Sequence, residues 1–305
     1  MIDIQALSHR YPRATSPALQ HIDLHIAQGE CWGLLGHNGA GKTTLMALMA
    51  GLQEVQQGAI LLNGVPMAQL KRPIRQKIGL VPQDFAFYPQ LSVWDNMLFF
   101  AALYQERQKA WLENLLDKAG LLPHRHKAAK HLSGGLKRRL NFAIGLINRP
   151  EWVFLDEITV GIDPQSRRFI LDSVAELTQQ GVTVVYTSHY LQEIEQLCSK
   201  IALLDQGKLV YQGDLTALLH TQTPTVRFST SAPLPPELCT QWQLQQDAHG
   251  IYETTAHAQQ AAQLYQHLQQ NGISLPYFQQ GHGSLESFYL DFLRRHVAQH
   301  EDTPT

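Results

Sequence analysis

Short apolar runs alternate with polar, glycine-containing loops and helix-forming segments along most of the chain. CWGLL at residues 31–35 and VFL at 153–155 are short and wholly apolar, so they predict buried strands of a parallel sheet. VTVVYTSH at residues 182–189 predicts another strand of the same kind. TLMALMAGL, which follows the first run, has helix-forming composition and ends at Gly51. The pattern therefore predicts an α/β fold around a parallel sheet.

Between residues 84 and 150 the pattern becomes helical. FAFYPQLSVWDNMLFFAALY is followed by an amphipathic segment, and core packing explains most apolar residues in both. The apolar face of that segment consists of Trp111, Leu112, Leu115, Leu116 and Ala119. We therefore predict a helical insertion within a first domain that spans residues 1–218 and closes with the hairpin-like IALLDQGKLVYQGD.

Residues 219–305 predict a second, smaller domain. Residues 221–224 and the proline-rich SAPLPPE mark its boundary and loops. VRF, WQLQQ and IYETT predict short strands, and SLESFYLDFLRRH predicts a final amphipathic helix. Another predicted helix carries an apolar face of Ala261, Leu264, Tyr265 and Leu268. This alternation predicts a small α+β domain without a catalytic constellation.

Composition narrows the class of protein. The chain has 305 residues, with 44% hydrophobic residues and 16% charged residues. This length exceeds the usual size of a single core. The formal net charge of -2 offers no basic excess for general nucleic-acid binding. No apolar run approaches the length of a membrane span and the N-terminus lacks a signal pattern, so we expect a cytoplasmic protein.

Cysteine and histidine spacings indicate no metal site. The three cysteines lie far apart in the sequence, and none belongs to a CxxC pair, so reduced core thiols are expected. They are Cys31, Cys198 and Cys239. A cluster of His124, His126 and His131 also lacks convincing ligand spacing, and we interpret it as solvated.

The stretch GHNGAGKTT, between the first predicted strand and helix, has the spacing of a phosphate-binding loop. Its glycines allow backbone N–H groups to surround a β-phosphate, Lys42 reaches the β and γ oxygens, and Thr43 ligates Mg²⁺. A chance glycine-rich turn is the alternative, but the full pattern between strand and helix favours a nucleoside triphosphate site. The stretch consists of Gly36, His37, Asn38, Gly39, Ala40, Gly41, Lys42, Thr43 and Thr44.

Two acidic residues follow the predicted strand in EWVFLDE. We assign Asp156 to the metal and Glu157 to polarising the attacking water, because a hydrolytic phosphate loop needs both functions at the end of a buried strand. Two acids after a strand are common by chance, but the phosphate loop strengthens the assignment. His189 ends the next predicted strand, where it would face the same crevice, although a lone histidine is more often an ordinary surface or core residue.

LSGGLKRRL at residues 132–140 resembles a second phosphate site. Ser133 stands at the expected cap of an amphipathic helix whose first turn exposes the amides of Gly134 and Gly135. Taken alone, the stretch favours an ordinary capped helix with a solvated basic face.

The phosphate loop, LSGG, the strand ending in Asp-Glu and the later histidine occur in an order that resembles the ATPase subunit of an ABC transporter. The resemblance covers residues 2–215. It implies a P-loop NTPase fold with a RecA-like core, an antiparallel β-subdomain and a helical subdomain. In that family two ATPase domains pack head to tail, and each ATP lies between the phosphate loop of one copy and the LSGG of the other. The resemblance thus implies a homodimer with ATP and Mg²⁺ as cofactors.

The resemblance assigns further roles to individual residues. Tyr11, placed before the first sheet, resembles the aromatic that stacks on adenine, although a tyrosine in such a turn is also simply exposed. Gln83 resembles the glutamine that ligates Mg²⁺ and senses the γ-phosphate, and His189 the histidine that contacts that phosphate. Asp163 resembles the aspartate that links the two sites across the dimer, although GIDP is also a plausible turn.

The closest pattern is an exporter branch of the drug, antibiotic and nodulation-factor type, in which the permease is a separate membrane protein. This implies a peripheral protein at the cytoplasmic face of the inner membrane, with no nucleic acid as partner. In the family the helical subdomain receives the permease, so Phe85, Phe87 and Tyr88 are the docking candidates. The sequence does not identify the transported substrate.

Two positions depart from the family pattern. Leu136 stands where glutamine is usual and Ile158 where proline is usual, and neither removes a phosphate ligand. They leave open a nucleotide-gated binding subunit without hydrolysis. A soluble ABC ATPase acting on ribosomes or DNA is the other alternative, but this chain has one phosphate loop and no sustained heptads.

Overall fold

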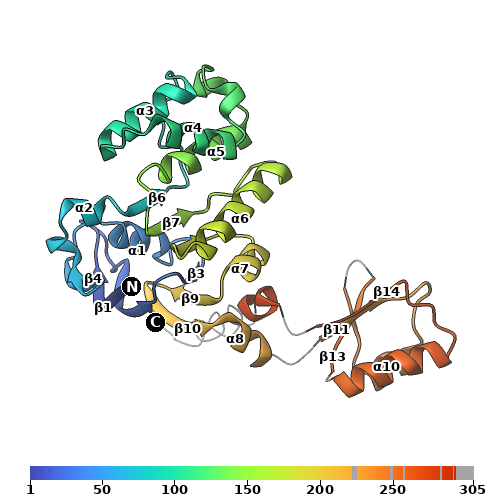
Figure 1. Ribbon diagram of the computed structural model, residues 1–305. Coiled ribbons are helices and arrows are strands. Elements are labelled where there is room, and N and C mark those ends of the chain that lie inside the picture. Colours follow the sequence, from blue (N-terminus) through green and yellow to red (C-terminus); the bar gives the residue numbers. More distant parts are fainter. Residues whose placement is uncertain (222–224, 248–249, 257, 282–283, 291, 293–305) are drawn as a thin grey trace. The chain divides into compact units, whose positions relative to one another are not determined.

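A six-stranded sheet organises the larger of the two units into which the chain divides. The computed structural model describes residues 1–221, 225–247, 250–256, 258–281, 284–290 and 292. Unit 1 is Met1–Asp214 and unit 2 is Leu215–Thr305. Figure 1 shows both units along the colour-coded chain.

The large sheet of unit 1 has the strand order β10-β9-β3-β8-β7-β6. Its strands are β10 (Lys208–Asp214), β9 (Lys200–Asp205), β3 (Cys31–Leu35), β8 (Thr183–Thr187), β7 (Trp152–Asp156) and β6 (Ile78–Val81). All neighbours are parallel except β10, which pairs antiparallel with β9. Every residue of β3, β7 and β8 is buried, as the uniformly apolar runs predict.

Helices follow the central strands. They are α1 (Lys42–Met49) after β3, α6 (Pro164–Gln179) after β7 and α7 (Leu191–Leu197) after β8. Because the strands are parallel, the loops that lead from each strand into its helix lie at one edge of the sheet. This arrangement is the predicted P-loop NTPase core.

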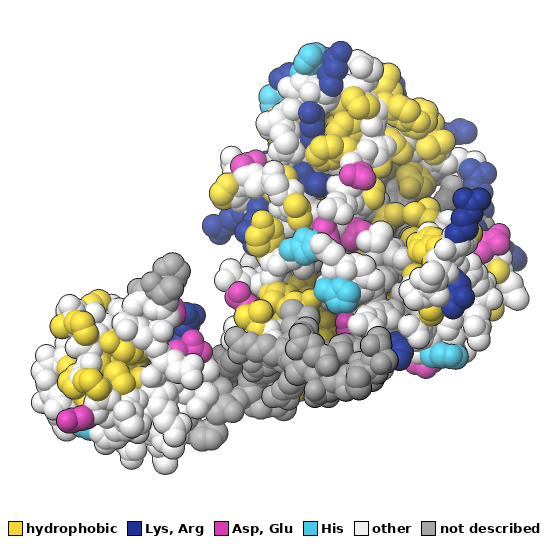
Figure 2. Space-filling model, turned by 180° about the vertical axis from the view of Figure 1, so that it is seen from behind, with side chains coloured by type: hydrophobic (Ala, Val, Ile, Leu, Met, Phe, Trp, Pro, Cys, Tyr) yellow, Lys and Arg dark blue, Asp and Glu magenta, His cyan; other side chains and the backbone are white. Residues whose placement is uncertain are grey.

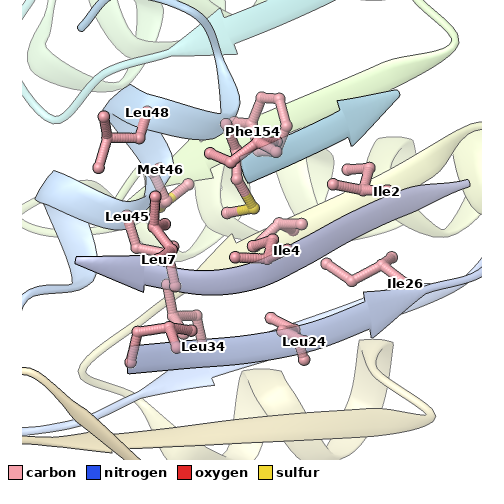
Figure 3. Close-up of a cluster of buried hydrophobic side chains, with 14 of the residues drawn as sticks. Ile2, Ile4, Leu7, Leu24, Ile26, Leu34, Leu45, Met46, Leu48 and Phe154 are labelled. Atoms are coloured by element: carbon pink, nitrogen blue, oxygen red, sulfur yellow. The ribbon is translucent and has the colours of Figure 1, made fainter. Parts of the chain in front are cut away.

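A smaller antiparallel sheet, with the order β2-β1-β4-β5, packs over this core. Its strands are β1 (Ile2–His9), β2 (Leu19–Ile26), β4 (Gln57–Leu62) and β5 (Val65–Pro66). Figure 3 shows Leu45 and Met46 of α1 beside Ile4 and Leu7 of β1, in a buried cluster that also contains Phe154. Tyr11 follows β1 and therefore lies within this sheet's first turn; the expectation that it precedes the first sheet is wrong.

The insertion between β6 and β7 is helical, as predicted. It contains α3 (Val93–Tyr104), α4 (Lys109–Lys118), η2 (Leu122–His124), η3 (Ala129–His131) and α5 (Gly134–Gly145), while η1 (Met67–Gln69) and α2 (Arg72–Arg75) precede β6. Figure 1 shows α3, α4 and α5 gathered together beyond the β6 side of the sheet. The hydroxyls of Ser92 and Ser133 cap α3 and α5. Leu112, Leu115 and Leu116 of α4 are buried.

Unit 2 begins with α8 (Leu215–Thr221) and continues as the predicted α+β domain. Its elements are β11 (Thr225–Ser229), α9 (Pro236–Gln241), β12 (Gln245–Gln246), β13 (Tyr252–Thr255), α10 (Ala258–Gln270) and β14 (Tyr277–Gly281). The sheet order β12-β13-β11-β14, with all neighbours antiparallel, makes this βαββαβ segment a split βαβ fold. Ala261, Leu264 and Leu268 of α10 are fully buried against it.

Several local expectations in unit 2 need correction. Residues 242–244 are not strand, and Trp242 is the C-cap of α9. This helix was not expected, although proline at its start favours it, and its first two residues belong to the predicted loop stretch SAPLPPE. Tyr265 is 37% exposed and lies at the margin of the α10 apolar face. β14 was not expected. The final helix is present at 285–290 and 292, and residues 291 and 293–296 of the predicted segment lie outside the described residues.

No helix in the described part of the chain is long and apolar enough to cross a membrane.

The packing of Phe154 yields a stability prediction. We expect Phe154→Ala to lower the free energy of unfolding by about 3–5 kcal/mol, because this fully buried ring lies between α1 and both sheets of unit 1. Urea unfolding followed by tryptophan fluorescence, with Trp242 replaced by Phe so that the signal comes from unit 1, measures this loss. Phe154→Leu, which leaves a smaller cavity, should lose less. Equal losses would contradict the packing argument.

Candidate functional site

The glycine-rich stretch forms a tight loop between β3 and α1. Gly41 is the N-cap of α1 and has a φ of 106°, a left-handed conformation that side chains rarely adopt. A Cβ at Gly41 would lie 2.6 Å from the carbonyl oxygen of Ala18. The glycine therefore lets the loop turn sharply, so that the first amides of α1 face the space beyond the sheet edge.

Lys42 is held against this loop. Its Nζ donates hydrogen bonds to the carbonyl oxygens of Gly36 at 2.8 Å and His37 at 3.2 Å. Burial lowers the pKa of Lys42, and the nearby carboxylates of Glu157 and Asp156 oppose that shift. These carbonyl oxygens accept from the Lys42 ammonium group. Phosphate oxygens are charged acceptors and would bind the same ammonium group more strongly.

Asp156, the last residue of β7, lies between two threonine hydroxyls. Thr43 Oγ1 donates to Asp156 Oδ2 at 3.1 Å, and Thr187 Oγ1 donates to Asp156 Oδ1 at 2.7 Å. These contacts join the carboxyl ends of β7 and β8 to the start of α1, the helix that follows β3. A threonine hydroxyl and a carboxylate at this distance fit the all-oxygen coordination of Mg²⁺, with phosphate oxygens as further ligands. No group of three or more His, Cys, Asp or Glu side chains in the described residues could hold a metal by itself.

Glu157 follows Asp156 with a strained backbone. Its φ is 50°, and its N–H donates to the carbonyl oxygen of Thr187 at 3.2 Å and to the Thr187 hydroxyl at 3.0 Å. The carboxylate is mostly buried and lies 3.0 Å from His189 Nε2, measured at Glu157 Oε1. The two hydrogen bonds from the Glu157 N–H to Thr187 thus stabilise the strained backbone, and in this conformation the Glu157 carboxylate contacts His189.

A cavity of about 530 Å³ lies beside Lys42, Thr43 and Glu157, and its volume suits a nucleotide. Asp156 is not among its lining residues and contacts it through Thr43. Tyr11 enters it from the turn after β1, and its hydroxyl lies 3.1 Å from Thr44 Oγ1. Gln83 enters it from the segment after β6. The cavity is lined by Tyr11, Ala18, Asn38, Gly39, Gly41, Lys42, Thr43, Thr44, Gln83, Glu157 and His189.

The LSGG stretch occupies a different place. Among the described residues that line the cavity, Ser133, Gly134, Gly135 and Asp163 do not occur. Ser133 caps α5 by accepting from the N–H of Leu136 at 3.3 Å, and Asp163 caps α6 by accepting from the N–H of Ser166 at 2.9 Å. The bonds from Ser166 lower the pKa of Asp163.

Gly135 is the point where α5 meets the start of α6. A Cβ there would lie 2.1 Å from Asp163 Oδ2 and 2.3 Å from Ser166 Oγ, so this close approach needs glycine. Ser133 and Gly134, by contrast, are exposed. The chain therefore presents a helix N-terminus to solvent, away from its own cavity.

The predicted docking aromatics divide into exposed and buried residues. Phe85 is 43% exposed and Tyr88 is 49% exposed. Phe87 is only 6% exposed, so its place among the docking candidates is wrong; it stacks on Phe85 with ring centroids 5.3 Å apart.

Two supporting residues were not foreseen. Thr187 lies inside a β-branched strand, where its hydroxyl gives no distinctive signal, yet it holds both Asp156 and Glu157. Arg138, expected on a solvated basic face, is buried and donates to the carbonyl oxygen of Gln83 at 2.6 Å. Burial lowers the pKa of Arg138. The structure also brings Cys31 and Cys198 together, with the two Sγ atoms 3.5 Å apart in the core.

The amino-acid sequence is similar to that of known proteins. The sequence profile described as ABC transporter matches residues 19–160. The linearmycin resistance ATP-binding protein LnrL of Bacillus subtilis (strain 168) is 38% identical over 72% of this chain and 70% of its own. The Nod factor export ATP-binding protein I of Burkholderia thailandensis is 33% identical over 78% of both chains.

A solved structure supports the fold. It is a dimeric ATP-binding cassette in a post-hydrolysis state bound to ADP and Pi, with a TM-score of 0.64 and 23% identity. The match covers 70% of this chain and 99% of the solved one. It corresponds in extent to most of unit 1.

The contact of Gly135 with Asp163 can be tested by paired substitutions. We expect Gly135→Ala to destabilise the protein by about 1–3 kcal/mol, because the added methyl group must displace a helix cap. Gly134→Ala is the matched control, since its Cβ would meet nothing within 4 Å. Thermal unfolding measures both. If the two variants have the same Tm, α5 and α6 do not pack as closely as described.

Proposed function

Since this chain belongs to the ABC transporter family and is the ATP-binding, ATP-hydrolysing subunit of such a transporter, we propose that it powers export of a substrate through a separate membrane permease. The observation that carries the proposal is the joining of the phosphate loop, Gln83, Glu157 and His189 in one cavity. Relatives named for linearmycin resistance and Nod factor export support the direction of transport. The chemical identity of the substrate is not part of the proposal.

In the proposed complex, ATP occupies the cavity with its phosphates at the N-terminus of α1. Lys42 exchanges its carbonyl partners for the β and γ oxygens, and the ring of Tyr11 stacks on adenine. Thr43, Gln83 and Asp156 hold Mg²⁺, a Lewis acid that stabilises charge on the phosphate oxygens when it is bound.

Glu157 and His189 act on the γ-phosphate end. Glu157 accepts a proton from a water molecule as the water oxygen bonds to the γ-phosphorus, and the bond to the β–γ bridging oxygen breaks to give ADP and phosphate. His189 contacts the γ-phosphate and positions Glu157 through the 3.0 Å contact. Ile158 is fully buried, so this departure from the family pattern points into the core.

Two copies complete two sites. Ser133 and Gly134 are exposed, and the LSGG helix start lies away from the chain's own cavity, so we propose that it binds the γ-phosphate held by a second copy. Asp163, at the adjacent helix start, would then lie at the junction of the copies. Leu136 follows this stretch and removes none of its phosphate donors.

The proposed permease surface is the exposed apolar patch of the helical insertion, defined as Phe85, Tyr88, Phe99 and Leu103. Tyr88 and Phe99 contact edge to face with centroids 4.8 Å apart. Figure 2 shows hydrophobic side chains gathered over the helical insertion, at the top of that view. Exposed apolar patches of this kind mark protein contacts. Through this contact the protein would be peripheral to the membrane, at its cytoplasmic face.

Removing the carboxylate base should stop turnover after binding. We expect Glu157→Gln to lower kcat for ATP hydrolysis by about 10²–10⁴-fold, because the amide cannot accept the proton of water, while ATP still binds. Phosphate release and a fluorescent ATP analogue measure the two effects. In the presence of ATP, the Glu157→Gln variant should also accumulate as a dimer, which size-exclusion chromatography with light scattering would detect.

Lys42→Ala serves as the contrasting variant, since it should lose nucleotide binding itself. Undiminished turnover in Glu157→Gln would overturn the assignment of the base, and normal hydrolysis in Lys42→Ala would overturn the assignment of the phosphate loop.

The transport role predicts a stoichiometric membrane partner. We expect tagged protein recovered from detergent-solubilised membranes to carry a polytopic membrane protein, identified and counted by mass spectrometry. Tyr88→Ser should reduce that recovery. Leu52→Ser is the control, because Leu52 is 67% exposed, more than Tyr88 at 49%, but lies outside the apolar patch. Recovery with ribosomal or DNA-bound proteins instead would favour a soluble mechanical ATPase.

A further inference from the structure

A carboxylate outside the cavity holds the segments that carry Glu157 and His189. Glu193 lies on α7, and its side chain is 1% exposed. Its Oε2 accepts hydrogen bonds from three hydroxyls, those of Thr159 at 2.8 Å, Tyr186 at 2.6 Å and Ser188 at 2.5 Å. Its Oε1 accepts from Arg167 Nε at 2.5 Å. Neither the sequence pattern nor the proposed chemistry gives this residue a role.

Each donor belongs to a segment near the reacting groups. Thr159 lies in the turn after Glu157, and that turn is closed by the N–H of Val160 donating to the Glu157 carbonyl oxygen at 3.3 Å. Ser188 directly precedes His189. Arg167 lies in the first turn of α6, where its N–H donates to the carbonyl oxygen of Asp163 at 3.0 Å. One carboxylate therefore joins the chain after β7, the chain after β8 and the start of α6.

The residues on both sides of His189 are fixed by this network. Ser188 Oγ donates to Glu193 and accepts from the N–H of Tyr190 at 3.0 Å. The Arg167 guanidinium lies over the Tyr190 ring, 4.2 Å from its centroid. His189 is thus an exposed imidazole between two anchored neighbours, which favours one position of its ring relative to Glu157.

The network needs an ionised acceptor. Three hydroxyl donors converge on one carboxylate oxygen, and all three are buried. Burial and the Glu193 charge raise the pKa of Tyr186 well above its usual value, so its hydroxyl keeps the proton that it donates. An amide nitrogen in place of Oε2 would face these hydroxyls as a donor and leave them without an acceptor.

We propose that Glu193 is a positioning residue for ATP hydrolysis, which fixes the main chain around His189 and Glu157 so that their side chains stay in contact. The proposal rests on the proposed roles of that pair. It goes beyond them because Glu193 does not line the cavity and acts through the four residues that donate hydrogen bonds to it, which are Thr159, Arg167, Tyr186 and Ser188. None of the described residues that hold the phosphate loop is a partner of Glu193 in these bonds.

The test is Glu193→Gln, assayed for both kcat and ATP affinity. We expect kcat to fall about 10²-fold, the usual consequence of misplacing reacting groups by about 1 Å, with the Kd for ATP unchanged. His189→Ala and the double variant complete a cycle. Because Glu193 acts through the contact between His189 and Glu157, the loss in the double variant should be smaller than the product of the two single losses. Fully multiplicative losses would overturn the proposal.

Controls separate positioning from folding. Glu176→Gln makes the same change on α6, where Glu176 forms an exposed ion pair with Lys118 of α4. This variant should leave kcat and Tm unaltered. If Glu193→Gln does not fold, Tyr186→Phe and Ser188→Ala replace it, since each removes one donor and keeps the carboxylate; either should lower kcat without changing Kd. Folded variants with normal kcat would refute the role of Glu193. Absence of hydrolysis by the unaltered protein would instead refute the proposed function.

Discussion

The paired hydrogen bonds of Asp156 with Thr43 and Thr187 are the contact on which the site geometry depends. They join the ends of β7 and β8 to the start of α1, which follows β3, and these three strands are neighbours in a parallel sheet. Parallel pairing brings those ends to one edge, and burial of all three strands fixes their register. The phosphate loop, the Asp-Glu pair and His189 follow from that arrangement, because each begins where one of these strands ends.

The same constraint explains what the sequence could predict. Uniformly apolar runs such as CWGLL have few alternatives to a buried strand, and glycine spacing requires a loop at a particular place. The helical insertion was expected from its own amphipathic pattern, whereas the antiparallel sheet was expected because the order of motifs resembles a known family. Where the pattern was weaker, in unit 2, residues 242–244 and β14 were misjudged, since short half-exposed strands depend on their neighbours rather than on their own composition.

The residues that sequence reasoning missed act through tertiary contacts. Arg138 belongs to a basic run that favours solvent exposure, but the carbonyl oxygens after β6 and the Phe85 ring enclose it. Phe87 has the same apolar, aromatic character as the exposed Phe85 and Tyr88, but its side chain is buried. Glu193 lies on α7, the helix that follows His189, and its sequence position gives no signal of a role. Only the fold brings Thr159 and Arg167 into contact with it. No spacing rule links residues whose contact depends on three different strands and helices.

The placement of the LSGG helix start supports the proposal that this stretch serves the site of a second copy. Gly135 packs so closely on Asp163 that α5 and α6 begin side by side, and Arg139 adds a bond from its Nε to Ser166 Oγ at 3.1 Å. This packing holds Ser133 and Gly134 outward rather than toward Lys42. A helix start exposed in this way has unpaired amides that favour an anion, and the chain's own cavity does not include it. A phosphate supplied by another copy satisfies both facts without any change in the fold.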